Sequence, residues 1–447
     1  MTPTSPQMLG TEFVCAVCHA VVGLESSLIF ACPHATDTDR RHVLHIRESI
    51  HPLQPIADSN PFLSFRKHLT VDAFGARIGL DELERINIIS ATNKQIEQVC
   101  GTGFVTTPIT RQDRLSDALG FSAAGGVWVK DETHNVAGSQ KGRHLFGTLL
   151  YLLMSERASR VPWASLEQRP ALAIASCGNA AIAAASLARA VQWPITVFVP
   201  VSSSPTVLEI LQSLGATVEV CRRQKDDSTG DPCIHRFRQA VAGGSIPFSV
   251  QGTENAWCLD GGRTIGWEIA TDLDFVLDRI YVQVGGGAFA SCVGSAFKTA
   301  GIHPRLHAVQ TSGCAPLSRA WDAAIEHGSA RDAGARWAEC MWPWEQEPHS
   351  LADGILDDET YDWISVLNAM ADTGGHPIVA DEELVIRAHQ MAHECTDIDV
   401  SPTGAAGLAG LIQNRHLLAD NERVALIFSG ISREGKLVSP VAGARPQ

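Results

Sequence analysis

The sequence has fewer basic than acidic residues and no long uninterrupted apolar run. It contains 35 Lys and Arg against 49 Asp and Glu among 447 residues, so its formal net charge is −14. A large basic surface for phosphate backbones is therefore not expected, and neither is a nucleic-acid partner. No apolar stretch reaches the roughly 18 residues of a membrane span. Met1 to Gly10 also lack the basic and apolar regions of a signal peptide. We expect a cytoplasmic protein that does not associate with membranes.

The twelve cysteines lack the dense, even spacing of a small disulfide-rich secreted domain. Most are expected to be reduced thiols buried as small apolar side chains. Internal repeats and low-complexity segments are missing too. The apolar fraction of 45% and the charged fraction of 19% are typical of a globular chain long enough for two or three domains.

Short apolar strands alternate with helices along most of the chain. The expected strands cover residues 127–130, 171–175, 195–199, 217–220, 280–284, 306–310 and 424–428. The expected helices cover 142–154, 180–191, 206–214 and 291–298. Strands that are apolar throughout and alternate with helices indicate mainly parallel sheets covered on both faces. Because single cores stop growing near roughly 250–300 residues, we expect two α/β domains.

The first candidate motif runs from Lys130 to Arg143 and contains Lys141 just after a Gly-Ser turn. Partial burial at the start of a helix would lower the pKa of the Lys141 amine and free it for Schiff-base chemistry. Taken alone, a lysine in such a place is more often a solvated surface residue.

A second motif, Ser176-Cys177-Gly178-Asn179-Ala180, lies at a strand-to-helix turn. The amides at the start of the helix could bind an anion such as a substrate carboxylate, and glycine allows a ligand to approach closely. An ordinary helix cap explains the same residues equally well, since Ser and Asn are common capping residues.

The third motif is Gly285-Gly286-Gly287-Ala288, between an expected strand and an expected helix. Consecutive exposed amides form a phosphate cradle. The Gly-Lys-Ser/Thr ending of a nucleoside-triphosphate loop is missing. A dinucleotide site would need an acidic residue about 20 positions further on, whereas the first one is Asp322. A phosphate-bearing cofactor without a diol fits better, and a plain glycine turn is the alternative.

A fourth motif, Phe428-Ser429-Gly430, follows the last expected strand. The Ser429 hydroxyl could hydrogen-bond a heterocyclic nitrogen at the carboxyl end of the sheet, or it could be an ordinary turn serine.

In this order, the four motifs resemble the fold-type II pyridoxal-phosphate (PLP) enzymes, which include threonine synthase, threonine and serine dehydratases and tryptophan synthase β. The resemblance runs from about Phe104 to Ser432. It implies two doubly wound, mainly parallel α/β domains with the cofactor in the cleft between them. The large domain would comprise 51–160 and 250–447, and the small mobile domain 160–250. A homodimer is also implied.

The resemblance implies a role for each motif. Lys141 would form the Schiff base with PLP and move the α-proton. The other cofactor-binding residues would be Asn179 at the 3′-oxygen, Gly285, Gly286, Gly287 and Ala288 at the phosphate, and Ser429 at the pyridine nitrogen. The substrate would contact Ser176, Cys177, Gly178, Ala180 and Arg143. Gln140 and Gly142 depart from the family's usual Phe and Asp, which leaves the substrate open.

The N-terminal segment, residues 1–50, contains a Cys-x-x-Cys pair and a second Cys/His pair. Cys15, Cys18, Cys32 and His34 are chemically able to form a structural zinc site. Free thiols and a surface histidine are the alternative. Some threonine synthase-like proteins carry a similar cysteine-rich head.

The predicted function is a PLP-dependent lyase or synthase that acts on an amino acid with a β- or γ-leaving group, in the manner of threonine synthase. A threonine or serine ammonia-lyase and a β-replacement enzyme are the alternatives within the family. From other classes, a non-catalytic regulator with the PLP fold and a dinucleotide-dependent oxidoreductase are possible. The retained Lys141 and Ser429 count against the first, and the missing acidic residue counts against the second.

Overall fold

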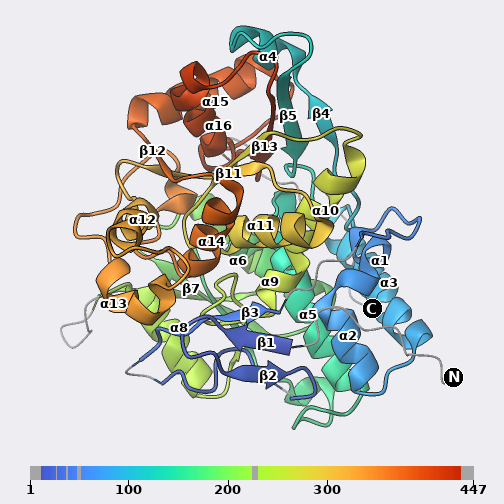
Figure 1. Cartoon of the computed structure of the whole chain (residues 1–447). Helices are drawn as coiled ribbons and strands as arrows, with labels where there is room; N and C mark the ends of the chain where they lie inside the picture. The colour runs from blue at the N-terminus through green and yellow to red at the C-terminus, as the bar shows by residue number, and fades with distance from the viewer. Residues whose placement is uncertain (1–11, 27, 37–38, 48–51, 224–229, 434–447) are drawn as a thin grey trace, which may run out of the picture.

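The computed structural model describes residues 12–26, 28–36, 39–47, 52–223 and 230–433. Six strands form the largest sheet, in the order β12-β11-β10-β13-β5-β4 (Figure 1). Their bounds are β4 Ile109–Arg111, β5 Gly126–Asp131, β10 Arg279–Gln283, β11 Arg305–Thr311, β12 Ile378–Ala380 and β13 Arg423–Phe428. All neighbouring strands are parallel except the edge strand β4, which pairs with β5 in antiparallel fashion.

Helices cover both faces of this sheet, and the side chains of its strands alternate between two hydrophobic cores. Ile280 and Val282 of β10 belong to a core that contains Phe297 of α11 (Ala288–Ala300). Tyr281, between them, belongs to a second core that contains Leu408 of α16 (Pro402–Asn414). The consecutive apolar residues of β10, from Ile280 to Val282, are therefore buried on one face or the other, as expected for a parallel strand inside an α/β sheet.

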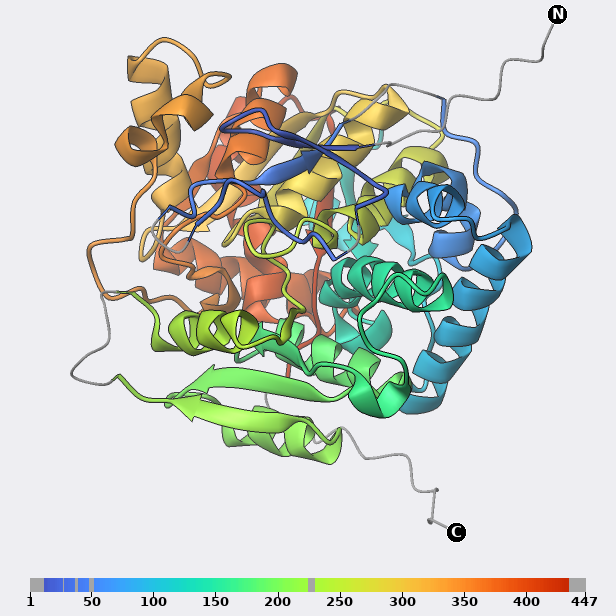
Figure 2. The ribbon, with the colours of Figure 1, turned by 90° about the horizontal axis from the view of Figure 1, so that it is seen from below.

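A smaller parallel sheet has the order β8-β7-β6-β9. Its strands are β6 Leu172–Ala175, β7 Ile195–Pro200, β8 Thr217–Cys221 and β9 Ile246–Pro247. It lies near the lower edge of the molecule in Figure 2, where its strands are green. These strands lie inside the predicted small domain at 160–250, and the boundaries of that domain stay a prediction.

A third sheet, antiparallel and in the order β2-β1-β3, lies near the N-terminus. Its strands are β1 Glu12–Cys15, β2 Val21–Gly23 and β3 Leu44–Ile46. We call the described residues from 12 to 47 the head. The head shares a core with the body of the protein, because Phe13 and Val22 pack in the same cluster as Phe74 and Trp257. Figure 1 shows its blue strands crossing the lower part of the molecule.

The remaining helices connect and cover these sheets. Their bounds are α1 Pro61–Ser64, α2 Thr70–Arg77, α3 Glu82–Cys100, α4 Asp113–Ala118, α5 Lys141–Arg157, α6 Asn179–Ala190, α7 Pro205–Ser213, α8 Pro232–Ala242, α9 Cys258–Gly261, α10 Arg263–Asp272, α12 Pro316–Glu326, α13 Trp337–Cys340, α14 Trp363–Thr373 and α15 Glu382–Cys395. Short 3-10 helices lie at Arg66–His68, Val136–Gly138, Leu166–Gln168, Ala333–Arg336, Asp353–Ile355 and Arg415–Leu417. Among the described residues, no helix has the length and apolarity required to span a membrane. The predicted α/β fold with mainly parallel sheets is confirmed.

Candidate active site

Lys141 is the first residue of α5, and the turn before it pairs with the segment after β13. The Gln140 N–H donates to the Ser429 carbonyl at 3.0 Å, and Ser139 forms a β-bridge with Gly430. Gly138 has φ +70° and lies so close to Ile431 that a Cβ atom would collide with its side chain. The first and fourth sequence motifs are therefore held side by side.

The Lys141 side chain is half-buried, and its surroundings change the pKa of the amine. Desolvation lowers this pKa below its ordinary value, and the negative charges nearby only partly oppose the shift. These charges belong to Asp357 and Asp362, and the thiols Cys258 and Cys292 would act in the same direction if ionised. A lowered pKa makes the free amine available for covalent chemistry with a carbonyl group.

His144 lies one helical turn after Lys141 and is fully buried. Burial, helped by the charge of Lys141, lowers its pKa to about 3, so the imidazole is neutral at physiological pH. Its Nδ1 lies 2.8 Å from the Cys258 carbonyl, whereas its Nε2 has no hydrogen-bond partner within the described ranges. We call the group formed by Lys141, His144, Cys258, Cys292, Asp357 and Asp362 the lysine site.

The three glycines follow β10 and lead into α11. Gly287 has φ +92°, a conformation that favours glycine, and it immediately precedes the first residue of the helix. The Gly286 N–H hydrogen-bonds the carboxylate of Asp357, whose pKa burial raises to about 6. At Gly285, a Cβ atom would collide with the same carboxylate. One amide of the loop, that of Gly286, is thus already directed at an acidic oxygen.

Asp362 is the second acidic member of the lysine site and is fully buried. Its Oδ2 accepts a hydrogen bond of 3.0 Å from the Gly252 N–H, and its own N–H donates to the Gly286 carbonyl at 2.8 Å. In the part of the chain that the structure describes, its Oδ1 has no hydrogen-bond partner. Burial raises the pKa of Asp362 to about 7, although Gly252 and Lys141 act in the opposite direction. A carboxyl group with this pKa is partly protonated at neutral pH.

Ser429 is buried at the end of β13 with a fixed hydrogen-bond role. The Gln283 Nε2 donates to the Ser429 Oγ at 2.7 Å. Because the amide supplies the proton in that bond, the Ser429 O–H remains free to donate to another acceptor. A donor here matches an unprotonated heterocyclic nitrogen.

The turn from Ser176 to Ala180 joins β6 to α6. No atom of the described residues lies within 4 Å of a Cβ placed at Gly178, so these residues leave open space above the turn. Cys177 is exposed, and partial desolvation together with Asp353 raises the pKa of its thiol. Asn179 lies close to Gly430, and its Oδ1 accepts a hydrogen bond of 2.8 Å from the Arg433 Nε. The amide Nδ2 of Asn179 thus points to the side where the second and fourth motifs meet.

Arg143 does not face the lysine site, which is a correction to its predicted role in binding the substrate. Its side chain is fully buried, and all three of its nitrogen atoms donate to protein groups. The partners are Glu132, Glu268, Thr107 and Thr264. A guanidinium occupied in this way has no donor left for a substrate phosphate.

The residues present fit a PLP molecule in four respects and oppose it in one. The desolvated Lys141 amine matches the aldehyde of PLP, and the free Ser429 hydroxyl matches its ring nitrogen. The Asn179 amide matches the 3′-oxygen, and the glycine cradle matches the phosphate. Asp357 opposes the phosphate, since its carboxylate hydrogen-bonds a cradle amide. We infer that the cradle suits an oxyanion. For the phosphate to bind there, the Asp357 carboxylate would have to leave the cradle or be protonated.

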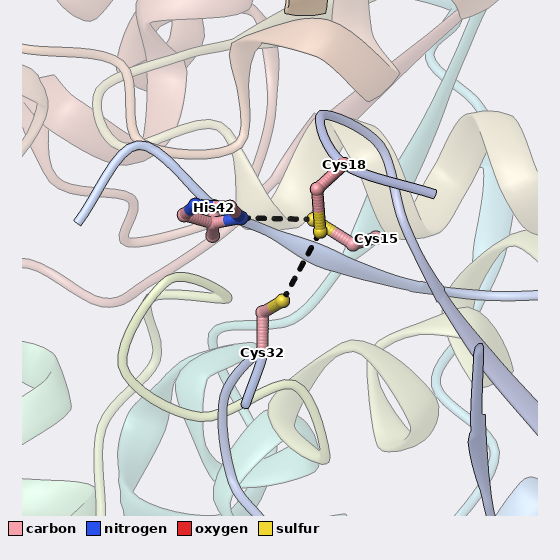
Figure 3. A group of neighbouring side chains, drawn as sticks. All are labelled: Cys15, Cys18, Cys32 and His42. Carbon is pink, nitrogen blue, oxygen red and sulfur yellow. Dashed lines mark hydrogen bonds between the residues drawn. The ribbon is translucent and has the colours of Figure 1, made fainter. Parts of the chain in front are cut away.

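The cysteines of the head form the predicted cluster, but with a different histidine (Figure 3). The ligand atoms of Cys15, Cys18, Cys32 and His42 all lie within 4.8 Å of one another. His34 is exposed and is not part of this group, which corrects the predicted ligand set. The reason is the fold of the head, since the Ala16 N–H donates to the Val43 carbonyl at 2.9 Å and so brings His42 beside Cys15.

Sequence reasoning missed Asp357, Asp362, His144, Gln283 and Arg433. The only signal for the first two was the acidic run Asp357-Asp358-Glu359, which lies about 70 positions after the glycine loop and belongs to no recognised motif. The structure brings it to the loop by folding the segment from residue 353 to the start of α14 over those glycines.

Comparison with known proteins agrees with the geometry. A family model described as pyridoxal-phosphate dependent enzyme matches residues 102–430. The threonine synthase of Methanosarcina acetivorans is 26% identical over 336 residues, which are 72% of this chain and 74% of that protein. The L-threonine ammonia-lyase of Geobacter sulfurreducens is 25% identical over 267 residues, 60% of each protein. The solved structure of the processed form of threonine deaminase isoform 2 from Solanum lycopersicum shares the fold, with a TM-score of 0.59 and 16% identity. That match covers 87% of this chain and 96% of that chain.

Proposed function

Because the chain belongs to the pyridoxal-phosphate dependent enzymes of fold type II, we propose that it removes a leaving group from the side chain of an amino acid, with Lys141 as the residue that binds the cofactor. The half-buried Lys141 amine carries this proposal, because desolvation lowers its pKa near Asp357, a residue whose carboxylate lies against the glycine loop. When bound, pyridoxal phosphate supplies an electron sink for the electron pair left at Cα.

The proposed tasks of the other residues follow from the motifs of the family and from the donors and acceptors available at these positions. The Lys141 Nζ accepts the proton from the substrate Cα. The amides of Gly285, Gly286, Gly287 and Ala288 bind the phosphate, Asn179 donates to the 3′-oxygen, and Ser429 donates to the ring nitrogen. The turn formed by Ser176, Cys177, Gly178 and Ala180 binds the substrate carboxylate through its amides.

Asp362 is the proposed proton donor to the leaving group. Its pKa of about 7 leaves a large fraction of the carboxyl protonated at neutral pH. Its Oδ1 has no partner among the described residues, so it can hydrogen-bond a substrate atom.

The charges at the lysine site favour a leaving group that is neutral or cationic. In their ionised forms Asp357 and Asp362 would repel a phosphate, whereas a protonated Asp362 can donate to a hydroxyl or amine leaving group. Arg143 cannot compensate for these charges because its donors are already used. We therefore place a hydroxyl or amine leaving group, as in ammonia-lyase chemistry, ahead of the predicted threonine synthase reaction.

One observation favours the threonine synthase reaction as the second candidate. Arg433 is half-buried beside Asn179, and desolvation lowers its pKa. Within the described residues, no carboxylate forms an ion pair with it. Such a guanidinium could bind the phosphate of O-phosphohomoserine.

The proposal is tested by spectra and by mass. We expect the visible absorption of bound PLP to shift on titration with threonine, serine or 2,3-diaminopropionate, but not with O-phosphohomoserine. After borohydride reduction, the mass of one PLP should appear on Lys141. The variant Lys141→Ala should lose this adduct, whereas Lys298→Ala, an exposed lysine on α11, should keep it.

Three results would change the assignment. A shift with O-phosphohomoserine alone, lost in Arg433→Met, would establish the second candidate instead. Bound PLP that no amino acid perturbs would indicate a non-catalytic regulator with this fold, and no adduct on Lys141 would refute the central assignment. The homodimer and the cytoplasmic location stay predictions.

A further inference from the structure

The head brings three thiols and one imidazole into the geometry of a metal site. The Cys15 Sγ lies 3.5 Å from the His42 Nδ1, and the Cys18 Sγ lies 3.6 Å from the Cys32 Sγ (Figure 3). In a tetrahedral zinc site the bond lengths are about 2.3 Å to sulfur and about 2.0–2.1 Å to nitrogen, so neighbouring ligand atoms lie roughly 3.5–3.8 Å apart. A disulfide would need about 2.05 Å between the two sulfur atoms.

The backbone of the head holds these ligands before any metal arrives. The knuckle between Cys15 and Cys18 is closed by the His19 N–H, which donates to the Cys15 carbonyl at 3.0 Å. A second turn at Cys32 is closed by the Ala35 N–H at 3.0 Å. Cys15, Cys32 and His42 are buried, and Cys18 is half-buried. We propose that Cys15, Cys18, Cys32 and His42 bind one Zn²⁺ ion and that this ion fixes the head against one wall of the lysine site.

Four protein ligands leave no open position for water or substrate, so the role of the metal is structural. The strands β1, β2 and β3 have only three or four residues each. So small a sheet buries little apolar surface, and binding a metal would supply part of the free energy that keeps it folded.

A chain of contacts connects the proposed metal to the lysine site. The turn just before Cys32 is bound to the segment before α9, because the Ala256 N–H donates to the Phe30 carbonyl at 2.7 Å and the Trp257 Nε1 donates to the Ile29 carbonyl at 3.0 Å. The Trp257 ring also packs against Phe13 of β1, with 4.9 Å between ring centroids.

From Trp257 the contacts continue to α5. Its ring stacks on Tyr151 at 4.0 Å between centroids, and the next residue, Cys258, places its carbonyl 2.8 Å from the His144 Nδ1. Lys141 begins the same helix. If the metal is lost, the turn before Cys32 loses an anchor, and the segment from Thr253 to Gly261 should become less protected.

Metal content tests the ligand set directly. We expect one zinc ion per chain by elemental mass spectrometry in the wild-type protein, and the same content in His34→Ala, the matched control with an exposed histidine. His42→Ala should bind zinc at least tenfold more weakly. No zinc in the wild-type protein after zinc-supplemented expression, or loss in His34→Ala with retention in His42→Ala, would overturn the assignment.

Cobalt substitution covers the case in which His42→Ala does not fold. Co²⁺ added to the chelated wild-type protein should give the thiolate charge-transfer and ligand-field absorption of a tetrahedral site. A protein without these bands would refute the site.

Hydrogen exchange tests the connection to the lysine site. Chelation should speed amide exchange in residues 253–261 and leave α15, which lies on the far side of the large sheet, unchanged. Equal exchange at 253–261 with and without metal would refute the connection. Neither readout involves PLP, so a failure here would leave the proposed function standing.

Discussion

Asp362 binds its proton more tightly than an ordinary aspartate does. Its pKa is about 7 in the folded protein and 3.8 in the absence of such an environment. Between these pH values the folded state therefore holds more protons than the unfolded chain does. The contribution of this group to the free energy of unfolding falls as the pH rises from about 4 to about 7.

Asp362→Asn should remove this dependence while keeping an acceptor for the Gly252 N–H. Between pH 5 and pH 8, we expect the wild-type protein to lose on the order of 2 kcal/mol of unfolding free energy relative to the variant. Urea denaturation at the two pH values measures this difference. Asp332→Asn, which changes an exposed carboxylate, should lose as much unfolding free energy between the two pH values as the wild-type protein does. The same loss in Asp362→Asn would contradict the raised pKa of Asp362.

At this scale a local pattern is enough to propose residues that stand in recognisable motifs. Lys141, Asn179 and Ser429 are such residues, and their roles at the site stay predictions. A local pattern could not identify Asp362 or His42, because tertiary contacts with residues distant in the sequence bring each of them to its site. Arg143 was misassigned because a motif gives position along the helix but not the direction of the side chain.

The start of α11 is the element on which the proposed phosphate site depends. Gly287 has a positive φ, and a Cβ atom there would lie 2.9 Å from the Thr360 Cγ2. Gly374, at the end of α14, has φ +71°, and a Cβ atom there would have no other atom within 4 Å. The two glycines share the backbone strain and differ in their surroundings.

Gly374→Ala should therefore cost only the backbone strain, about 1–2 kcal/mol of unfolding free energy. Gly287→Ala should cost more than this and should also weaken PLP binding at least tenfold, since either the alanine or the segment at Thr360 must move. Urea denaturation and PLP absorbance titration measure the two effects. Equal PLP affinity in both variants would show that the loop does not bind the cofactor.

The sequence predicted the central strands of both parallel sheets because each is a run of apolar residues buried on two faces. It did not predict β4, β9 or β12, which have only two or three residues each. Strands this short carry no periodic signal, and pairing with a longer neighbour defines them.

At the scale of the whole molecule, a buried group of charges ties the large sheet to the helices beneath it. Lys130 on β5, Arg143 on α5 and Glu268 on α10 are fully buried and form ion pairs with one another through Glu268. Arg143 also pairs with Glu132 at 2.9 Å. Two positive and two negative groups thus balance inside the core, and removing one leaves an uncompensated charge.

Glu268→Gln should lower the unfolding free energy by about 3–5 kcal/mol. Glu345→Gln, which breaks an exposed pair with Arg319, should have little effect. Thermal and urea denaturation compare the two variants. Similar small losses in both would mean that the buried group does not hold the molecule together.

The same buried charges limit what the Lys130–Arg143 motif can indicate when it is used as a sequence signature of function. Glu132 and Arg143 contribute to the scaffold under the lysine and have no donor or acceptor directed at a substrate. Chains retrieved from a genome by this pattern would share a support for the cofactor while differing in the reaction they catalyse. Sorting such a collection by chemistry would require comparing the residues that correspond to 353–362, where the charge next to the lysine is set.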